Sequence, residues 1–275
     1  MGEARKKSRR HVDILRAETR CIYCAAPPAQ IEHMPPRAMF KTKSRPNGMV
    51  FATCAECNNG TSAADLVASF VSRLRPDDVV DDWEIKEAGA LRPMLERKAP
   101  GFLKEFFRPD KNTTTWRRTS VGLLKPRVKV SADGPLVKGY LRVFASKLGM
   151  ALYREHIGTP LAIEGAVYTQ WFLNAGLAQA TADAMLSILP AWGALRQGSF
   201  EVDNQFGYRF NSDDKSIVAA LAKFHSGLYI FTIATSHPER YPLPVRGENT
   251  AILRPGELFD HMPPKGELFW PKSNE

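Results

Sequence analysis

Four cysteines in two Cys-x-x-Cys pairs are the feature that most restricts what this chain can fold into. Cys21 and Cys24 form the first pair, Cys54 and Cys57 form the second, and the sequence contains no other cysteine. Each pair places two sulfur atoms on one tight turn, and two such pairs at this separation are typical of a structural zinc site with four thiolate ligands. The spacing therefore predicts one Zn²⁺ ion that joins two turns distant in sequence.

A thioredoxin-like redox pair and a disulfide pair are the alternatives for these cysteines. A redox pair needs only one such motif, and residues 1–20 are charged and lack the apolar stretch of a secretory signal. We therefore expect a reducing, cytoplasmic location, in which the thiolates remain available for zinc. Four protein thiolates leave zinc no open coordination position, so this ion is expected to hold the fold and not to perform chemistry.

Three polar residues accompany the cysteines. Glu32 and His33 lie between the two pairs, and Asn58 directly follows the last cysteine. With them, the segments CIYC, IEHMPPR and CAECNNG resemble the HNH endonucleases, and among these the phage endonuclease VII type with its four-cysteine zinc. The resemblance covers residues 15–75 and implies a ββα-metal finger, in which a β-hairpin and a helix surround a catalytic metal ion.

The family roles carry over by position. The resemblance implies that His33, at the end of the first strand, is the general base that takes a proton from the attacking water. It also implies that Glu32, where the family more often has aspartate, and Asn58 hold a catalytic Mg²⁺ or Mn²⁺. This chemistry is reasonable, because carboxylate and amide oxygens suit hard cations and an imidazole titrates near neutral pH.

The last ligand position of the motif has no clear match in this chain. Asn59, Thr61 and Asp65 are the polar candidates on the helix that should follow the second cysteine pair. Ser62 to Asp65 also fits a capping box, in which the carboxylate accepts a hydrogen bond from a backbone amide at the helix start. We favour capping for Asp65, which leaves the third ligand open.

The charge of the chain favours a polyanionic partner. The 275 residues carry a net charge of +9, which makes nucleic acid the default partner: DNA is expected and RNA is not excluded. Candidate phosphate contacts are Arg37, Lys41, Lys43 and Arg45, although Arg37 is equally compatible with a solvated loop. The basic residues of segment 1–12 suggest either an arm along the phosphate backbone or a disordered terminus. No apolar run is long enough to cross a membrane.

The composition shifts after residue 75, where prolines and aspartates indicate a boundary. We expect two domains: 1–75, with a basic arm and the HNH finger, and 76–275, an α+β domain with an antiparallel sheet that serves targeting, regulation or oligomerisation. The apolar periodicity predicts helices at 102–107, 136–156 and 175–189, and strands at 113–119, 127–131, 166–172, 200–210 and 228–234.

Two smaller patterns in residues 76–275 also predict local structure. Lys138, Arg142 and Lys147 lie largely off the apolar stripe of helix 136–156, so they form either a solvated basic face or a surface for nucleic acid. Segments 144–149 and 221–227 each pair an apolar helix end with a glycine, which is how many helices stop.

Two hypotheses of different classes follow from the sequence. The first is a metal-dependent HNH endonuclease acting on DNA, of a kind found in bacterial defence, phages and mobile elements; homo-oligomers are possible, since cutting both strands with one site often needs two copies. The second is a zinc-knuckle module without chemistry that docks nucleic acid or protein. A scaffold needs only the thiolates, so the Glu32, His33 and Asn58 set favours the nuclease.

Overall fold

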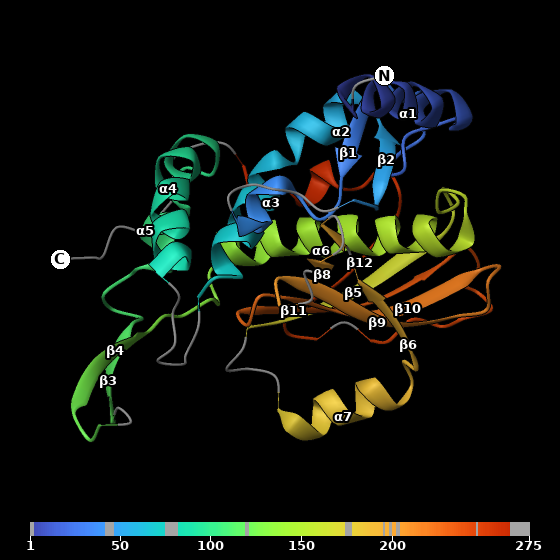
Figure 1. Ribbon diagram of the computed structural model, residues 1–275. Coiled ribbons are helices and arrows are strands. Elements are labelled where there is room, and N and C mark those ends of the chain that lie inside the picture. Colours follow the sequence, from blue (N-terminus) through green and yellow to red (C-terminus); the bar gives the residue numbers. More distant parts are fainter. Residues whose placement is uncertain are drawn as a thin grey trace.

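The computed structural model describes residues 3–41, 47–74, 82–118, 121–173, 178–194, 196–197, 200–201, 204–245 and 247–264. It is a mixed helix and sheet structure (Figure 1). The helices are α1 (Glu3–Ala17), η1 (Arg37–Met39), α2 (Ala55–Gly60), α3 (Ser62–Val71), α4 (Asp82–Lys98), α5 (Phe102–Phe106), α6 (Pro135–Ile157), α7 (Gln179–Ser187) and η4 (Phe259–His261). The strands are β1 (Gln30–His33), β2 (Val50–Thr53), β3 (Thr113–Arg118), β4 (Leu124–Lys129), β5 (Ala166–Leu173), β6 (Ala191–Ala194), β7 (Arg196–Gln197), β8 (Phe200–Glu201), β9 (Phe206–Ser212), β10 (Ile217–Phe224), β11 (Leu228–Thr235) and β12 (Thr250–Leu253).

The largest sheet has six strands in the order β12-β5-β11-β10-β9-β6, and all neighbouring strands run antiparallel. This confirms the expected antiparallel sheet. The three remaining two-stranded sheets are β1-β2, β3-β4 and β7-β8. The sequence pattern predicts that segment 221–227 ends a helix. This prediction is wrong, because the segment forms the end of β10 and the turn into β11.

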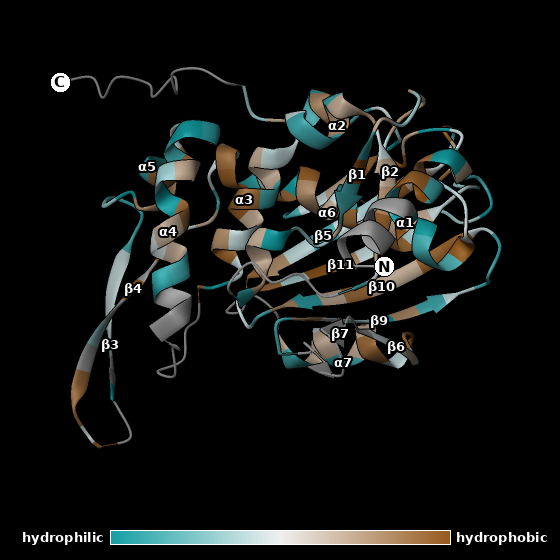
Figure 2. Cartoon of the chain, turned by 45° about the horizontal axis from the view of Figure 1, so that its top comes forward, coloured by the Kyte–Doolittle hydropathy of each residue, from teal (hydrophilic) through white to brown (hydrophobic). Residues whose placement is uncertain are grey.

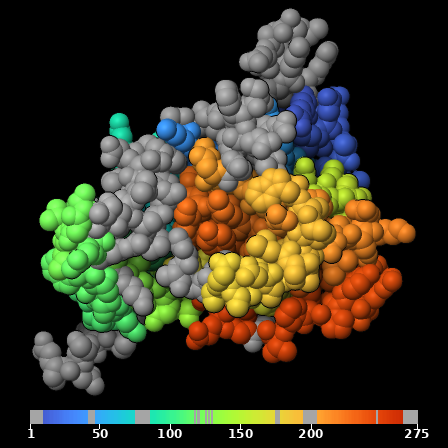
Figure 3. Space-filling view, turned by 60° about the horizontal axis from the view of Figure 1, so that its bottom comes forward, coloured from blue at the N-terminus to red at the C-terminus, as the bar shows by residue number. Residues whose placement is uncertain are grey.

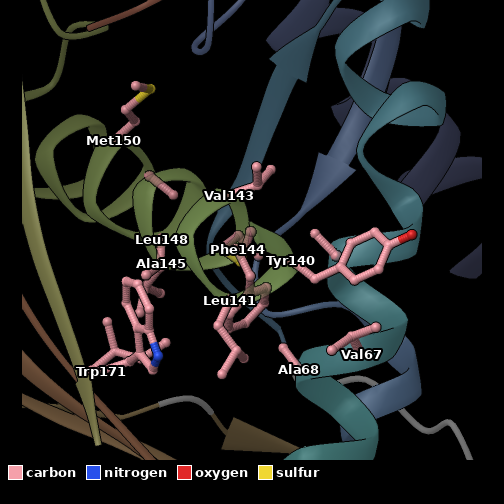
Figure 4. Close-up of a cluster of buried hydrophobic side chains, with 14 of the residues drawn as sticks. Val67, Ala68, Tyr140, Leu141, Val143, Phe144, Ala145, Leu148, Met150 and Trp171 are labelled. Atoms are coloured by element: carbon pink, nitrogen blue, oxygen red, sulfur yellow. The ribbon is translucent and has the colours of Figure 1, made fainter. Parts of the chain in front are cut away.

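Helix α6 lies across one face of this sheet and beneath α3. Pro135 starts the helix and Gly158 ends it in the left-handed conformation, with φ 87°, so both ends carry residues that favour a boundary. Figure 4 shows Leu141 and Phe144 of α6 in the space between α3 and Trp171 of β5. The close approach of helix and sheet needs a glycine, since a Cβ on Gly149 would overlap Val167.

A second, smaller apolar cluster covers the opposite face of the sheet. It contains Tyr168, Leu189, Leu221 and Phe231, with Met185 of α7 packed against it. Figure 3 shows the yellow surface of α7 next to the orange strands on this side. The sheet is therefore buried on both faces, which explains why its strands are more apolar than a strict alternation would require.

The C-terminal segment returns to the N-terminal part of the chain. The backbone N–H of Gly256 donates to the carbonyl of Tyr23 over 2.7 Å, and the ring of Phe259 lies directly on Gly60. The main core cluster contains residues from both sides of the predicted boundary at 75/76. The boundary itself lies outside the described residues, so the division into two domains stays a prediction.

Most predicted elements correspond to observed ones, with two further corrections. The basic segment near the N-terminus lies in α1, which begins at Glu3, and its contact with a phosphate backbone stays a prediction. Lys147 is not on a solvated helix face, since its side chain is completely buried. Asp65 does not cap α3: the cap residue Thr61 makes no side-chain capping bond, and the Asp65 carboxylate binds Lys147. Among the described residues, no helix is long and apolar enough to cross a membrane.

Candidate metal centre

The four cysteines come together as the spacing predicted. Their Sγ atoms all lie within 4.8 Å of one another, and Cys24 Sγ is 3.7 Å from Cys54 Sγ and 3.6 Å from Cys57 Sγ. A tetrahedral zinc with Zn–S bonds of about 2.3 Å requires sulfur separations of about 3.8 Å. All four cysteines are free of disulfides. The cluster can therefore hold a zinc ion.

Local backbone geometry prepares these sulfurs for a metal. The N–H of Tyr23 donates to Cys21 Sγ and the N–H of Cys57 donates to Cys54 Sγ, each over 3.3 Å. Hydrogen bonding with the Cys57 side chain lowers the pKa of the Cys21 thiol to about 5. The thiolate is the form that binds zinc, so the cluster favours the ionised state at Cys21, whereas burial raises the pKa of the Cys24 thiol to about 11.

A short β-hairpin joins the two cysteine pairs. Strand β1 pairs antiparallel with β2, with Glu32 opposite Phe51 and His33 opposite Val50. Ile22 N donates to the carbonyl of Ala52 over 3.2 Å, which ties the first cysteine turn to β2. Helix α2 begins directly after Cys54, and the cluster thus connects a hairpin to the helix that follows it.

His33 occupies the last position of β1 and is half-buried. Its ring lies edge-on to the ring of His11 from α1, with centroids 5.9 Å apart. The sequence analysis did not single out His11. No local pattern would have identified it, because the contact depends on how α1 packs beside the hairpin.

Asn58 lies in the first turn of α2, beside β1. Its side-chain Nδ2 donates to Gln30 Oε1 over 2.9 Å, so the carbonyl end of the amide points away from Gln30. Gln30 and Glu32 share one face of β1, since side chains alternate along a strand. Asn58 therefore lies on the same side of the hairpin as Glu32.

Glu32 is only 3 % exposed and takes part in a buried ion cluster. Its Oε1 is 3.2 Å from Lys147 Nζ, and Lys147 Nζ also donates to both carboxylate oxygens of Asp65 over 2.9 and 2.8 Å. The same ammonium group lies over the ring of Tyr23, 5.5 Å from its centroid. One cation from α6 thus faces two carboxylates of the N-terminal part.

This cluster is incompletely satisfied. Glu32 Oε2 and the hydroxyl oxygen of Tyr23 are buried without a hydrogen-bond partner among the described residues. Burial raises the pKa of the Glu32 carboxyl to about 7, against the opposing effect of Lys147. A buried acceptor without a donor is costly, so a cation or a water molecule at Glu32 Oε2 would stabilise this region.

The side chains of Glu32 and His33 contact different parts of the structure. Glu32 faces α3 and α6 through Asp65 and Lys147, whereas His33 contacts α1 through His11. This follows from the alternation of side chains along β1. Glu32 and Asn58 therefore lie on one side of the hairpin, with Lys147 as a positive charge beside Glu32.

Two of the four predicted phosphate contacts lie in the described structure, at η1 and just after it. Arg37 and Lys41 are exposed, and the backbone N–H of Lys41 donates to Gln205 Oε1 over 2.8 Å. Lys43 and Arg45 lie outside the described residues.

Comparison of the chain with protein-family models, with curated proteins and with solved structures gave no match.

Proposed function

We propose that this protein is a metal-dependent nuclease of the HNH type that hydrolyses phosphodiester bonds of DNA. The observation that carries the proposal is the arrangement around the cysteine cluster. A hairpin whose first strand ends in His33 is joined to helix α2, whose first turn contains Asn58, and Asn58 contacts that strand. The order of these parts supports a ββα-metal finger stapled by structural zinc.

The residues would divide the chemistry as follows. Glu32 Oε2 and the Asn58 carbonyl would hold a hydrated Mg²⁺ or Mn²⁺, which suits oxygen ligands. A bound divalent ion supplies charge neutralisation on the phosphoryl oxygens. His33 would take the proton of the attacking water. Its Nδ1 is buried, so the proton would pass from the water to Nε2. Arg37 would contact phosphate from the exposed rim.

Cleavage of supercoiled plasmid DNA tests this proposal. In the presence of magnesium or manganese, His33→Ala should lower the rate at least about a hundredfold, as expected for loss of a general base. DNA affinity, zinc content and melting temperature should stay unchanged. His237→Ala is the matched control, since that histidine is exposed in the turn after β11 and pairs with Glu239. A His33→Ala protein that cuts at the wild-type rate would show that the base is misassigned.

One observation favours the second candidate, a zinc-stapled module without chemistry. Lys147 already provides a positive charge to Glu32 and Asp65, so these carboxylates have a structural role without any divalent ion. Wild-type protein that binds DNA yet cuts no supercoiled, linear or branched substrate across a panel of divalent ions would select this candidate.

A further inference from the structure

The β3–β4 ribbon stands apart from the rest of the fold. Its two strands form a sheet of their own, and Figures 1 and 2 both show it extending away from the helices and the six-stranded sheet. In both views it lies at the opposite end of the molecule from the β1–β2 hairpin. An isolated two-stranded ribbon has little stability in water, which raises the question of what it contacts.

The pairing register sorts the ribbon into two different faces. Paired residues in an antiparallel ribbon share a face, and neighbouring pairs alternate. One face has the pairs Thr114–Val128, Trp116–Pro126 and Arg118–Leu124. The alternate pairs are Thr113–Lys129, Thr115–Arg127 and Arg117–Lys125. The first set of pairs is thus mainly apolar, and the alternate set consists of threonines and cations.

The apolar face is open to solvent. Trp116 is 65 % exposed, Val128 63 % and Leu124 62 %. Val121 and Leu123, in the connection between the strands, are also exposed. A tryptophan and several aliphatic side chains gathered on one exposed ribbon are typical of an interaction surface.

The charge of this segment indicates the kind of partner. The ribbon, residues 113–129, contains the five cations Arg117, Arg118, Lys125, Arg127 and Lys129 and no carboxylate. Such a segment is complementary to a polyanion. A two-stranded β-ribbon also has the width that the major groove of duplex DNA admits, and exposed apolar side chains serve many DNA-binding proteins as wedges against base steps.

We infer that the β3–β4 ribbon is a DNA-binding arm that lies in a groove of duplex DNA. The cationic pairs are assigned to the phosphates and the Trp116 face to the bases. This inference rests on the proposed function for its substrate class, and it adds a second contact far from the presumed cutting site. Because the two regions lie at opposite ends of the molecule, one DNA must be long enough to reach both.

Binding measured without added magnesium or manganese tests the ribbon independently of catalysis. Fluorescence anisotropy would compare the wild-type chain with a Lys125→Ser, Arg127→Ser, Lys129→Ser triple variant on a labelled duplex of about 40 base pairs, roughly four helical turns. We expect Kd to rise at least about tenfold and the slope of log affinity against log salt to fall by about 3, because each phosphate contact contributes about 0.9. Lys215→Ser, Arg240→Ser, Arg254→Ser removes the same charge from exposed body positions and should change Kd by less than about twofold.

Trp116→Ala separates base contact from phosphate contact. It should weaken duplex binding while leaving the salt slope unchanged, since no charge is removed. A duplex of about 12 base pairs, close to one helical turn, is too short to reach both regions, so the wild-type chain should bind it more weakly than the longer duplex.

Three results would overturn the inference. They are unchanged duplex binding by both ribbon variants, tighter binding of single strands than of duplex through the ribbon, and a shift from dimer to monomer in Trp116→Ala by sedimentation, which would assign the apolar face to a second copy. Failure of the nuclease proposal looks different: binding would remain ribbon-dependent while no variant, nor the wild-type chain, cuts DNA in magnesium or manganese.

Discussion

The two hairpins of the N-terminal half, β1–β2 and β3–β4, have the same architecture but opposite surroundings. Each consists of two short antiparallel strands in a sheet of its own. The first is joined to four clustered cysteines, has α1 beside it and directs Glu32 into a buried ion cluster. The second projects from the body with Trp116 on an exposed apolar face. Phe51 and Ala52 of the first hairpin are buried, whereas the second has no comparable covering in the described structure.

The difference shows that a two-stranded sheet takes its stability from what surrounds it. Two short strands alone bury too little apolar surface to offset their loss of conformational entropy. The first hairpin depends on thiolates, a lysine and helices supplied by other parts of the chain. The second hairpin keeps its apolar face available for a partner. Substitutions in the first should therefore be costly to the fold, and substitutions in the second should be costly only to binding.

Loss of one thiolate should have the largest effect on the first hairpin. Structural zinc contributes on the order of 10 kcal/mol to the folding of small zinc modules. Cys57→Ser should release zinc and lower the melting temperature sharply, as should a strong chelator added to the wild-type chain. Metal analysis and calorimetry on the same samples measure both effects. Unchanged thermal stability in the zinc-free protein would contradict a structural role for the ion.

Removing Lys147 should have the next largest effect. Lys147→Met would leave Glu32 and Asp65 buried together without a cation, and breaking a buried ion pair in this way costs about 3–5 kcal/mol. The triple variant Lys147→Met, Glu32→Gln, Asp65→Asn removes all three charges and should recover most of that loss. Urea unfolding of the two variants measures the difference. A loss below about 1 kcal/mol in the single variant would show that the cluster is not a structural link.

Glu32→Gln should have an effect that depends on pH. Burial raises the folded-state pKa of Glu32 from its ordinary 4.5 to about 7, so the folded chain binds this proton more tightly than the unfolded chain. The resulting stability is present below pH 4.5 and is lost as pH rises to about 7. Relative to wild type, Glu32→Gln should therefore become more stable by up to about 3 kcal/mol between these limits. Unfolding titrations near pH 5 and near pH 8 measure the change; a constant difference would contradict a titrating, buried Glu32.

The smallest effect on stability is expected in the second hairpin. Trp116→Ala should change the free energy of unfolding by no more than about 0.5 kcal/mol, because the side chain is exposed. Trp171→Ala is the matched control: this tryptophan is 2 % exposed in the main core, and its truncation should cost about 3–5 kcal/mol. If Trp116→Ala proved as destabilising as Trp171→Ala, the ribbon would be part of the folded body.

Features that depend on residues close together in the sequence were predictable, and features that depend on distant residues were not. Helix α6 was predicted at 136–156 and observed at Pro135–Ile157, because its apolar stripe and its terminal residues are local signals. The cysteine cluster was also predictable, because the spacing of the four cysteines can be read from the sequence. Lys147 was not, because its burial depends on Glu32 and Asp65, more than about 80 residues away in sequence. The contact between His11 and His33 likewise depends only on helix packing.

Strand β10 was missed for a related reason. Segment 221–227 begins in β10 with apolar residues and ends at a glycine. The end of a helix often shows the same pattern. Pairing within the sheet makes this segment a strand, since Leu221 pairs with Arg209 of β9 on one side and with Phe231 of β11 on the other. Neither partner is identifiable from the segment itself.

The return of the C-terminal segment to Tyr23 and Gly60 has a consequence for how the chain is made. The cysteines leave the ribosome early, but Gly256 and Phe259, which contact their surroundings, follow about 200 residues later. At ordinary rates of translation this interval is about 10–40 s. A zinc ion captured by the nascent thiols during that time would have to be held without the closing contacts.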